Sequence, residues 1–169
     1  MNKKKTYLPT YEGCIVCGQK ETNPNTMNLR FEVTDEGVQV PFTPGKRQEG
    51  YKDVVHGGII CSLLDETIGW AIAVERKKIF VTGELNVRFV RSLPIGTPIL
   101  VKGWSVEHKS RYSIGKGEIV DADGTVYAKG SGKYFFMPEQ YAKEVTKYLT
   151  FREGDLDVLA EDQHPESQN

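Results

Sequence analysis

One long apolar segment, without proline and without strict alternation, constrains the fold most. Between residues 57 and 75 the apolar side chains cover well over half of a helix circumference, which is typical of a buried helix. The basic residues of "ERKK" (75–78) follow at the end of this segment, where the helix dipole favours positive charge. The rest of the chain therefore has to pack around this helix.

Four segments after the helix alternate between two faces, as strands do. They are "FVTGELNVRFVRSLP", "PILVKGWSVEHK", "RYSIGKGEIVDADG" and "TVYAKGSGKYFFMP". One face carries small residues, among them Gly103, Gly115, Gly117 and Gly130, and glycine inside a strand indicates that another element approaches closely. The pattern predicts an α+β fold in which a curled antiparallel sheet wraps around one long central helix.

The flanking segments are weaker in pattern. "LRFEV" and "GVQVPF" predict two short strands around the turn "TDEG", and "PEQYAKEVTKYL" predicts a short helix. Residues 1–13 are expected to form a loose arm, and the tail that ends in "AEDQHPESQN" is expected to fray. We divide the chain into an N-terminal arm and loop (1–27), a domain (28–138), and a C-terminal helix with a flexible acidic tail (139–169).

Composition excludes some classes of protein. The chain has 169 residues, a formal net charge of −1 and 27% charged residues, which lacks the basic excess of nucleic-acid binders. No unbroken apolar run reaches the roughly 18 residues of a membrane span, and the basic start "MNKKKTYLP" lacks the apolar core of a secretory signal. We expect a cytoplasmic protein that binds neither nucleic acid nor membrane.

Two glycines begin the helix, directly after His56. Gly57 and Gly58 leave the first backbone amides of the helix unshielded by side chains, and these amides lie at the positive end of the helix dipole without intrahelical partners. They can bind a developing oxyanion. The alternative is that the two glycines only permit a tight turn.

Asp65 and Glu66 interrupt the apolar segment. At about 100° per residue the helix neighbours of Asp65 are largely small, so its carboxylate faces open space. A carboxylate on a buried helix is costly unless it is paired or used, and burial would raise its pKa as a base requires. A structural ion pair is the alternative. Glu66 points about 100° away and is expected to be a structural or exposed acid, or a substitute for Asp65.

The spacing of these groups predicts an oligomer. Gly57 and Asp65 are eight residues apart, which corresponds to roughly 12 Å along a helix, so one helix cannot bring both to one carbonyl group. Two antiparallel copies can, with the start of one helix opposite Asp65 of the other. This chemistry therefore requires a two-fold dimer with two equivalent shared sites.

The motifs together resemble the hotdog-fold acyl-CoA thioesterases. The resemblance rests on His56-Gly57-Gly58, on "LLDE" at 63–66, on "VTGELNVRFVRSLPIG" and on "DADGTVYAKGSGKYF", and it covers about residues 29–138. The closest type acts on thioesters similar to phenylacetyl-CoA and 4-hydroxybenzoyl-CoA. The leader "CIVCG…NP…NLRF" is also similar to one branch of the family.

The resemblance implies hydrolysis of an acyl-CoA to a carboxylic acid and free coenzyme A, with these roles. The Gly57 N–H polarises the thioester carbonyl, and Asp65 of the partner subunit activates water or attacks directly. His56 orients the loop and contacts the substrate, and Thr82 supplies a hydroxyl that assists the water or the acid. Relatives often have an asparagine where this chain has Gly50, so Gln48 or Glu49 takes over that role or the role is missing.

Substrate binding would involve further residues. The phosphates of coenzyme A require basic groups, and the candidates for substrate binding are Gly58, Glu66, Arg88, Arg91, Lys109 and Arg111, although solvated surface charge is the alternative for each basic residue. Coenzyme A is part of the substrate, so no separate cofactor is expected. The partner is a second copy of the chain, in a homodimer or a homotetramer built as a dimer of dimers.

Two other functions remain open. This fold also serves non-catalytic acyl-CoA-binding proteins, and it serves enoyl-CoA hydratases and dehydratases, which place an aspartate and a histidine differently.

Cys14 and Cys17 have the spacing of half a zinc site, but a closed site needs four ligands, and neither Cys61 nor the three histidines show ligand spacing. We therefore expect no metal, and a thiol pair that either packs at the domain edge or is redox-sensitive.

Overall fold

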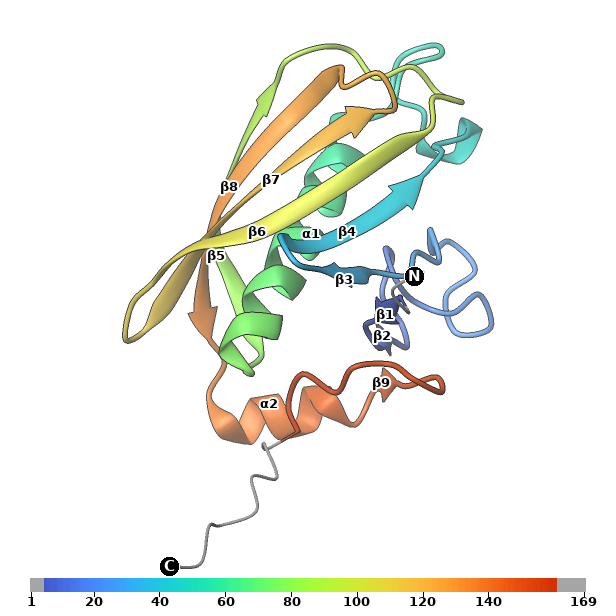
Figure 1. Ribbon diagram of the computed structural model, residues 1–169. Coiled ribbons are helices and arrows are strands. Elements are labelled where there is room, and N and C mark those ends of the chain that lie inside the picture. Colours follow the sequence, from blue (N-terminus) through green and yellow to red (C-terminus); the bar gives the residue numbers. More distant parts are fainter. Residues whose placement is uncertain (1–4, 161–169) are drawn as a thin grey trace, which may run out of the picture.

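The computed structural model describes residues 5–160, and its centre is a single long helix. Helix α1 (Gly57–Arg76) lies against the concave face of a curved sheet (Figure 1). It begins after His56, whose side chain caps it, and it ends at Lys77 in the left-handed conformation (φ 51°). The predicted helix is confirmed, and its start coincides with the Gly57-Gly58 pair.

The sheet is antiparallel throughout. Among residues 5–160, seven strands follow the order β1-β3-β4-β6-β7-β8-β5. In chain order they are β1 (Thr6–Tyr7), β3 (Glu32–Thr34), β4 (Gly37–Phe42), β5 (Phe80–Phe89), β6 (Ile99–His108), β7 (Tyr112–Asp121) and β8 (Val126–Phe136). The remaining elements are β2 (Thr10–Tyr11), β9 (Leu149–Thr150), the 3₁₀ helix η1 (Lys46–Gln48) and helix α2 (Glu139–Thr146). The predicted α+β fold with its curled sheet is confirmed.

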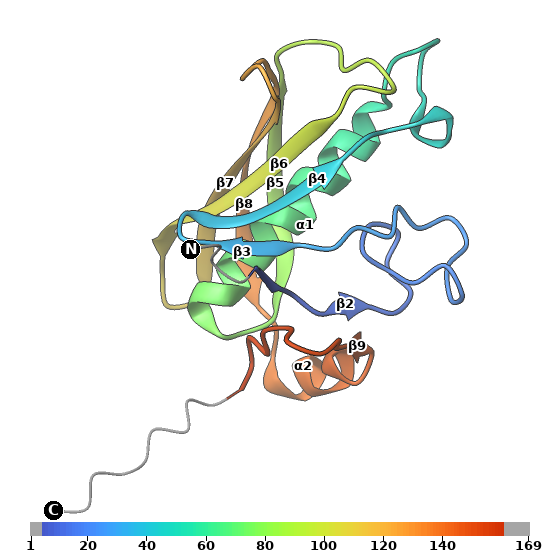
Figure 2. The ribbon, with the colours of Figure 1, turned by 45° about the vertical axis from the view of Figure 1, so that its right-hand side comes forward.

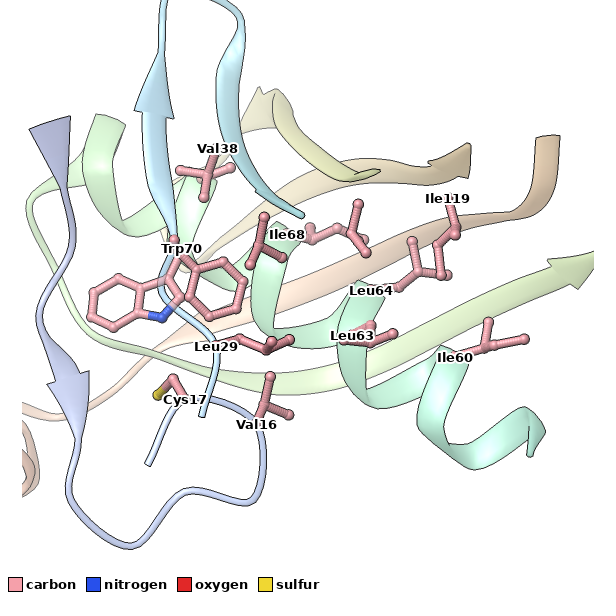
Figure 3. Close-up of a cluster of buried hydrophobic side chains, with 14 of the residues drawn as sticks. Val16, Cys17, Leu29, Val38, Ile60, Leu63, Leu64, Ile68, Trp70 and Ile119 are labelled. Atoms are coloured by element: carbon pink, nitrogen blue, oxygen red, sulfur yellow. The ribbon is translucent and has the colours of Figure 1, made fainter. Parts of the chain in front are cut away.

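The small residues of the later strands allow the helix to lie close to the sheet. A Cβ atom at Gly103 of β6 would lie 2.7 Å from the carbonyl oxygen of Thr67 in α1. A Cβ at Gly117 of β7 would lie 3.0 Å from Cγ1 of Ile68, so these positions tolerate no side chain. The apolar side chains of α1 then fill the remaining space, together with Val38 and Ile119 of the sheet (Figure 3).

Helix α1 corrects one expectation about membranes. By length and composition, this 20-residue helix, with a mean hydropathy of 1.4, could cross a bilayer. The prediction that no segment reaches this length rested on unbroken apolar runs, which Asp65 and Glu66 interrupt, and by mean hydropathy it is wrong. The core helix of a soluble protein passes the same test, and α1 is packed against the sheet.

The predicted loose arm at the N-terminus is wrong for residues 5–13. Strand β1 pairs with β3, and β2 pairs with β9 to form a second, two-stranded sheet. Leu8, between them, is fully buried. Two-residue strands carry no periodicity, and for this reason the sequence pattern did not indicate them.

The frayed C-terminal tail is wrong for residues up to 160. After α2 the chain forms β9 and passes beneath the N-terminal strands (Figure 2). Val158 is buried, and Asp155 forms an ion pair with Arg30. The predicted fraying beyond residue 160 lies outside the described residues, and the predicted domain boundaries remain predictions.

Candidate active site

The first turn of α1 presents one unused amide. The Nδ1 atom of His56 accepts a hydrogen bond from the Gly58 N–H at 2.9 Å, so the side chain of His56 caps the helix and occupies the amide of Gly58. Within residues 5–160 no acceptor bonds to the Gly57 N–H. This N–H lies at the positive end of the helix dipole and is available to an external oxygen atom.

A depression of about 390 Å³ surrounds Gly57. It is lined by apolar groups of the loop before α1, of α1 and of β5, including Val54, Ile60 and Phe89. Arg91 also lines it and brings a positive charge to this end of the helix. The depression can therefore hold a carbonyl group at the Gly57 amide beside a basic side chain.

Two hydroxyl groups hold the Asp65 carboxylate. Its Oδ1 atom accepts a hydrogen bond from Thr82 Oγ1 at 2.8 Å and one from the Tyr134 hydroxyl at 3.1 Å. Tyr134 lies almost completely buried on β8, and burial followed by the negative charge of Asp65 raises its pKa well above the usual value. Tyr134 therefore remains a donor, and both hydroxyls fix the carboxylate in one orientation.

A second cavity, of about 220 Å³, opens beside this carboxylate. Its polar lining includes Asp65, Thr82 and Tyr134, and the rest is mainly apolar. The apolar lining includes Trp70 and Phe80, and Leu149 of β9 contributes from the C-terminal segment. A carboxylate beside an apolar cavity can act on a molecule that places an apolar group in this cavity.

The two half-sites lie at different places along α1. One continuous helix joins Gly57 to Asp65, so their separation of roughly 12 Å follows from helix geometry. They line separate cavities within residues 5–160. A single chain therefore offers an unused N–H donor in one place and a carboxylate in another.

Glu66 is turned toward the N-terminal loop. A hydrogen bond of 3.0 Å joins Cys14 Sγ and Glu66 Oε2, and Cys17 lies in the same cluster. The hydrogen bond with Cys17, followed by that with Glu66, lowers the pKa of Cys14 to about 5. Burial, followed by the proximity of Cys14, raises the pKa of Glu66 well above its usual value. Sequence reasoning missed this contact, because nothing in the sequence pairs residues 52 positions apart.

The four predicted coenzyme A ligands do not come together in one chain. Arg88 and Arg91 lie near the end of β5 that contacts Gly57. Lys109 and Arg111 flank the turn between β6 and β7, at the opposite end of the sheet, and Lys109 is ion-paired with Glu107. Of the four, the structure places Arg91 beside the candidate oxyanion site.

Neither proposed substitute for the missing asparagine is free. Gln48 Oε1 accepts a hydrogen bond from the Gly45 N–H at 2.9 Å. Glu49 Oε1 binds Lys46 Nζ at 2.8 Å and accepts from the Asp53 N–H. A Cβ at position 50 would lie 2.9 Å from the Cα of His56, so the loop packs against the His56 backbone where an asparagine side chain would begin.

Comparisons with known proteins agree with this fold. Residues 52–128 match the model of the thioesterase superfamily. A comparison with curated proteins finds no match. Among solved structures, a thioesterase superfamily protein is 28% identical over 69% of this chain and 57% of that chain, with a TM-score of 0.63.

Two further structures share the fold at lower identity. The Escherichia coli PaaI protein from the phenylacetic acid degradation operon is 19% identical over 66% of this chain and 81% of that chain, with a TM-score of 0.61. A hypothetical thioesterase protein from Streptococcus pneumoniae, solved with coenzyme A, is 18% identical over 66% and 90%, also with a TM-score of 0.61. The resemblance to hotdog-fold thioesterases is confirmed.

Proposed function

Because residues 52–128 of this chain match the model of the thioesterase superfamily, we propose that the protein hydrolyses an acyl-CoA to a carboxylic acid and free coenzyme A. The observation that carries the proposal is the Asp65 carboxylate, held by two hydroxyl groups at the wall of an apolar cavity. A carboxylate kept in this position has no structural cation as a partner within the described residues. It is therefore placed to act on a bound molecule.

The reaction needs only two protein groups. The Gly57 N–H donates a hydrogen bond to the thioester carbonyl oxygen, and Asp65 takes a proton from a water molecule. The water oxygen bonds to the carbonyl carbon, the C–S bond breaks, and coenzyme A leaves as a thiolate that is then protonated. Since a thiolate is a good leaving group, no serine nucleophile is required.

The edge of the sheet supports the shared site. Strand β5 is an outer strand of the seven-stranded sheet, and its residues Val81 and Phe89 are exposed apolar side chains. Long apolar edges of this kind pair with other strands. Thr82, near one end of β5, binds Asp65, and Phe89, at the other end, lies beside Gly57.

Antiparallel pairing of β5 with a second copy would bring unlike ends together. The Thr82 end of one strand then lies opposite the Phe89 end of the other, by two-fold symmetry. Gly57 of one chain and Asp65 of the partner subunit would face the same space. The position of the two half-sites beside this edge strand supports the proposed dimer.

A panel of acyl-CoA substrates with a free-thiol readout tests the function, and phenylacetyl-CoA belongs in it because of the similarity to PaaI. We expect thiol release by the wild-type protein and a loss of about 10²–10⁴-fold in Asp65→Asn, with the circular dichroism spectrum unchanged. Binding without turnover would favour a non-catalytic acyl-CoA-binding protein. A change in enoyl absorbance without thiol release would favour a hydratase or dehydratase.

A further inference from the structure

Three potential metal ligands meet beside the candidate active site. The donor atoms of Cys14, Cys17 and Glu66 all lie within 4.8 Å of one another. Cys17 is buried, while Cys14 and Glu66 are partly buried. The proposed reaction does not involve these three residues. The cluster joins the N-terminal loop to α1.

The backbone around the two cysteines directs N–H donors at the sulfur atoms, which stabilises negative charge on them. The N–H groups of Val16 and Cys17 donate to Cys14 Sγ at 3.2 and 3.4 Å. The Tyr11 N–H donates to Cys17 Sγ at 3.3 Å. Donors directed at sulfur stabilise thiolates, which are the form of cysteine that binds metal.

Gly18 completes this turn. Its N–H donates to the carbonyl oxygen of Cys14 at 3.0 Å, and a Cβ at this position would lie 2.3 Å from that oxygen. Only glycine permits the chain to fold back so tightly behind the second cysteine. The sequence Cys-x-x-Cys-Gly thus holds both sulfur atoms on the same side, toward α1.

The cluster is electrostatically incomplete without a cation. Two thiolates and a carboxylate cannot all ionise at this spacing, because each negative charge disfavours the next. A divalent cation would offset the repulsion and allow all three groups to ionise.

We propose that Cys14, Cys17 and Glu66 bind one Zn²⁺ ion. Sulfur ligands of a tetrahedral zinc ion lie about 3.8 Å apart, given Zn–S bonds of about 2.3 Å, and the three donor atoms, all within 4.8 Å of one another, are close enough to bind one ion. Thiolate ligands select zinc over magnesium or calcium. Three protein ligands leave one position for a water molecule.

The ion would fix one wall of the active-site cavity. Glu66 directly follows Asp65, and Tyr11, next to the cysteine loop, lines the same cavity as Asp65. The site would connect positions that are 52 residues apart in the chain. We assign the ion the role of positioning this wall, with its fourth position open, and this role does not depend on the thioesterase proposal.

Metal content tests the proposal directly. The full chain is purified under reducing conditions without chelator, and its zinc is measured by elemental analysis. We expect about one zinc ion per chain, the same content in Cys61→Ser, and a loss of most zinc in Cys14→Ser and in Glu66→Gln. Cys61 is the matched control, because it is the third cysteine and lies outside the cluster.

A spectroscopic measurement on the unmodified chain tests the proposal even if the variants fail to fold. After removal of zinc, Co²⁺ added to the reduced protein should give sulfur-to-cobalt charge-transfer bands and the strong visible absorption of tetrahedral cobalt. Protein that contains no zinc and gives no such bands would overturn the proposal. So would a folded Cys14→Ser variant with the zinc content of the wild type.

Discussion

Asp65 and Glu66 are adjacent in the sequence but meet different surroundings. The carboxylate of Asp65 faces two hydroxyl groups and an apolar cavity, whereas that of Glu66 faces two cysteines. The difference follows from the helix, which turns neighbouring side chains about 100° apart. The two carboxylates therefore have separate partners, and that of Asp65 is available for the proposed reaction.

The amide of Gly57 can be removed without disturbing the helix. Gly57 is the first residue of α1, a position where proline is favoured, and His56 before it is extended (φ −62°, ψ 135°), as a residue before proline must be. We expect Gly57→Pro to lower kcat for thioester hydrolysis by about 10²–10³-fold, since it removes the oxyanion donor.

Gly57→Ala is the matched control for this variant. It keeps the N–H, and its Cβ would meet the Phe89 ring at 3.4 Å, so activity should stay close to that of the wild type. Steady-state kinetics of both folded variants decide the matter. Equal loss in the alanine and proline variants would show that bulk, and not the amide, matters at this position.

The hydroxyl of Tyr134 positions the base. It donates to Oδ1 and to the main-chain oxygen of Asp65, both at 3.1 Å. We expect Tyr134→Phe to lower the free energy of unfolding by about 1 kcal/mol and kcat by about 5- to 10-fold, the value of one hydrogen bond. Denaturation and kinetics on the same preparation measure both effects.

Tyr127→Phe provides the comparison for Tyr134→Phe. It removes a hydrogen bond of 2.9 Å to Asp121, the last residue of β7, near the end of β8 opposite to Tyr134. The free energy of unfolding of Tyr127→Phe should fall by about as much as that of Tyr134→Phe, while kcat stays unchanged. If Tyr134→Phe also retains full kcat, the positioning role is wrong.

Some residues of the candidate site could be predicted from the sequence, and others could not. Gly57, Asp65 and Thr82 were assigned from helix spacing and from the family resemblance, and the structure brings Thr82 to Asp65. Tyr134 was missed, although it continues the small-residue face of β8 at period two and was open to detection there. The contact between Cys14 and Glu66 could not be predicted, because no local sequence pattern encodes a long-range contact.

At the level of elements, the fold depends on how closely α1 approaches β6. The backbone of Gly103 contacts the backbone of Thr67 and Ile68, with no space for a Cβ atom. We expect Gly103→Ala to lower the free energy of unfolding by about 1–3 kcal/mol, the typical cost of overpacking. Gly13→Ala is the control, because a Cβ atom at that position would have no neighbour within 4 Å, and its change should stay within about 0.5 kcal/mol. Urea denaturation measures both, and equal stability of the two variants would refute this packing.

The sequence predicted those elements that carry a strong period. The helix and the four long strands each extend over ten or more residues, so their alternation or apolar coverage stands out from chance. Strands β1, β2 and β9 are two residues long and form only because they meet other segments. The terminal segments were therefore misjudged as loose, since their order depends on tertiary contacts.

At the scale of the whole molecule, we propose that each chain holds two half-sites beside the edge strand β5. The Gly57 amide and the Asp65 carboxylate line separate cavities, and β5 connects them through Phe89 and Thr82. A second copy paired along β5 would complete both sites at once. In this proposal, catalysis and assembly depend on the same strand.

Subunit mixing tests the shared site most directly. Gly57→Pro and Asp65→Asn chains, each inactive alone, are unfolded together, refolded in equal amounts and assayed for thiol release. In a heterodimer one site lacks both groups and the other has both intact, so random pairing should restore about one quarter of the wild-type activity. If the mixture stays as inactive as the separate variants, while refolded wild type recovers its activity, the site shared between two chains is contradicted.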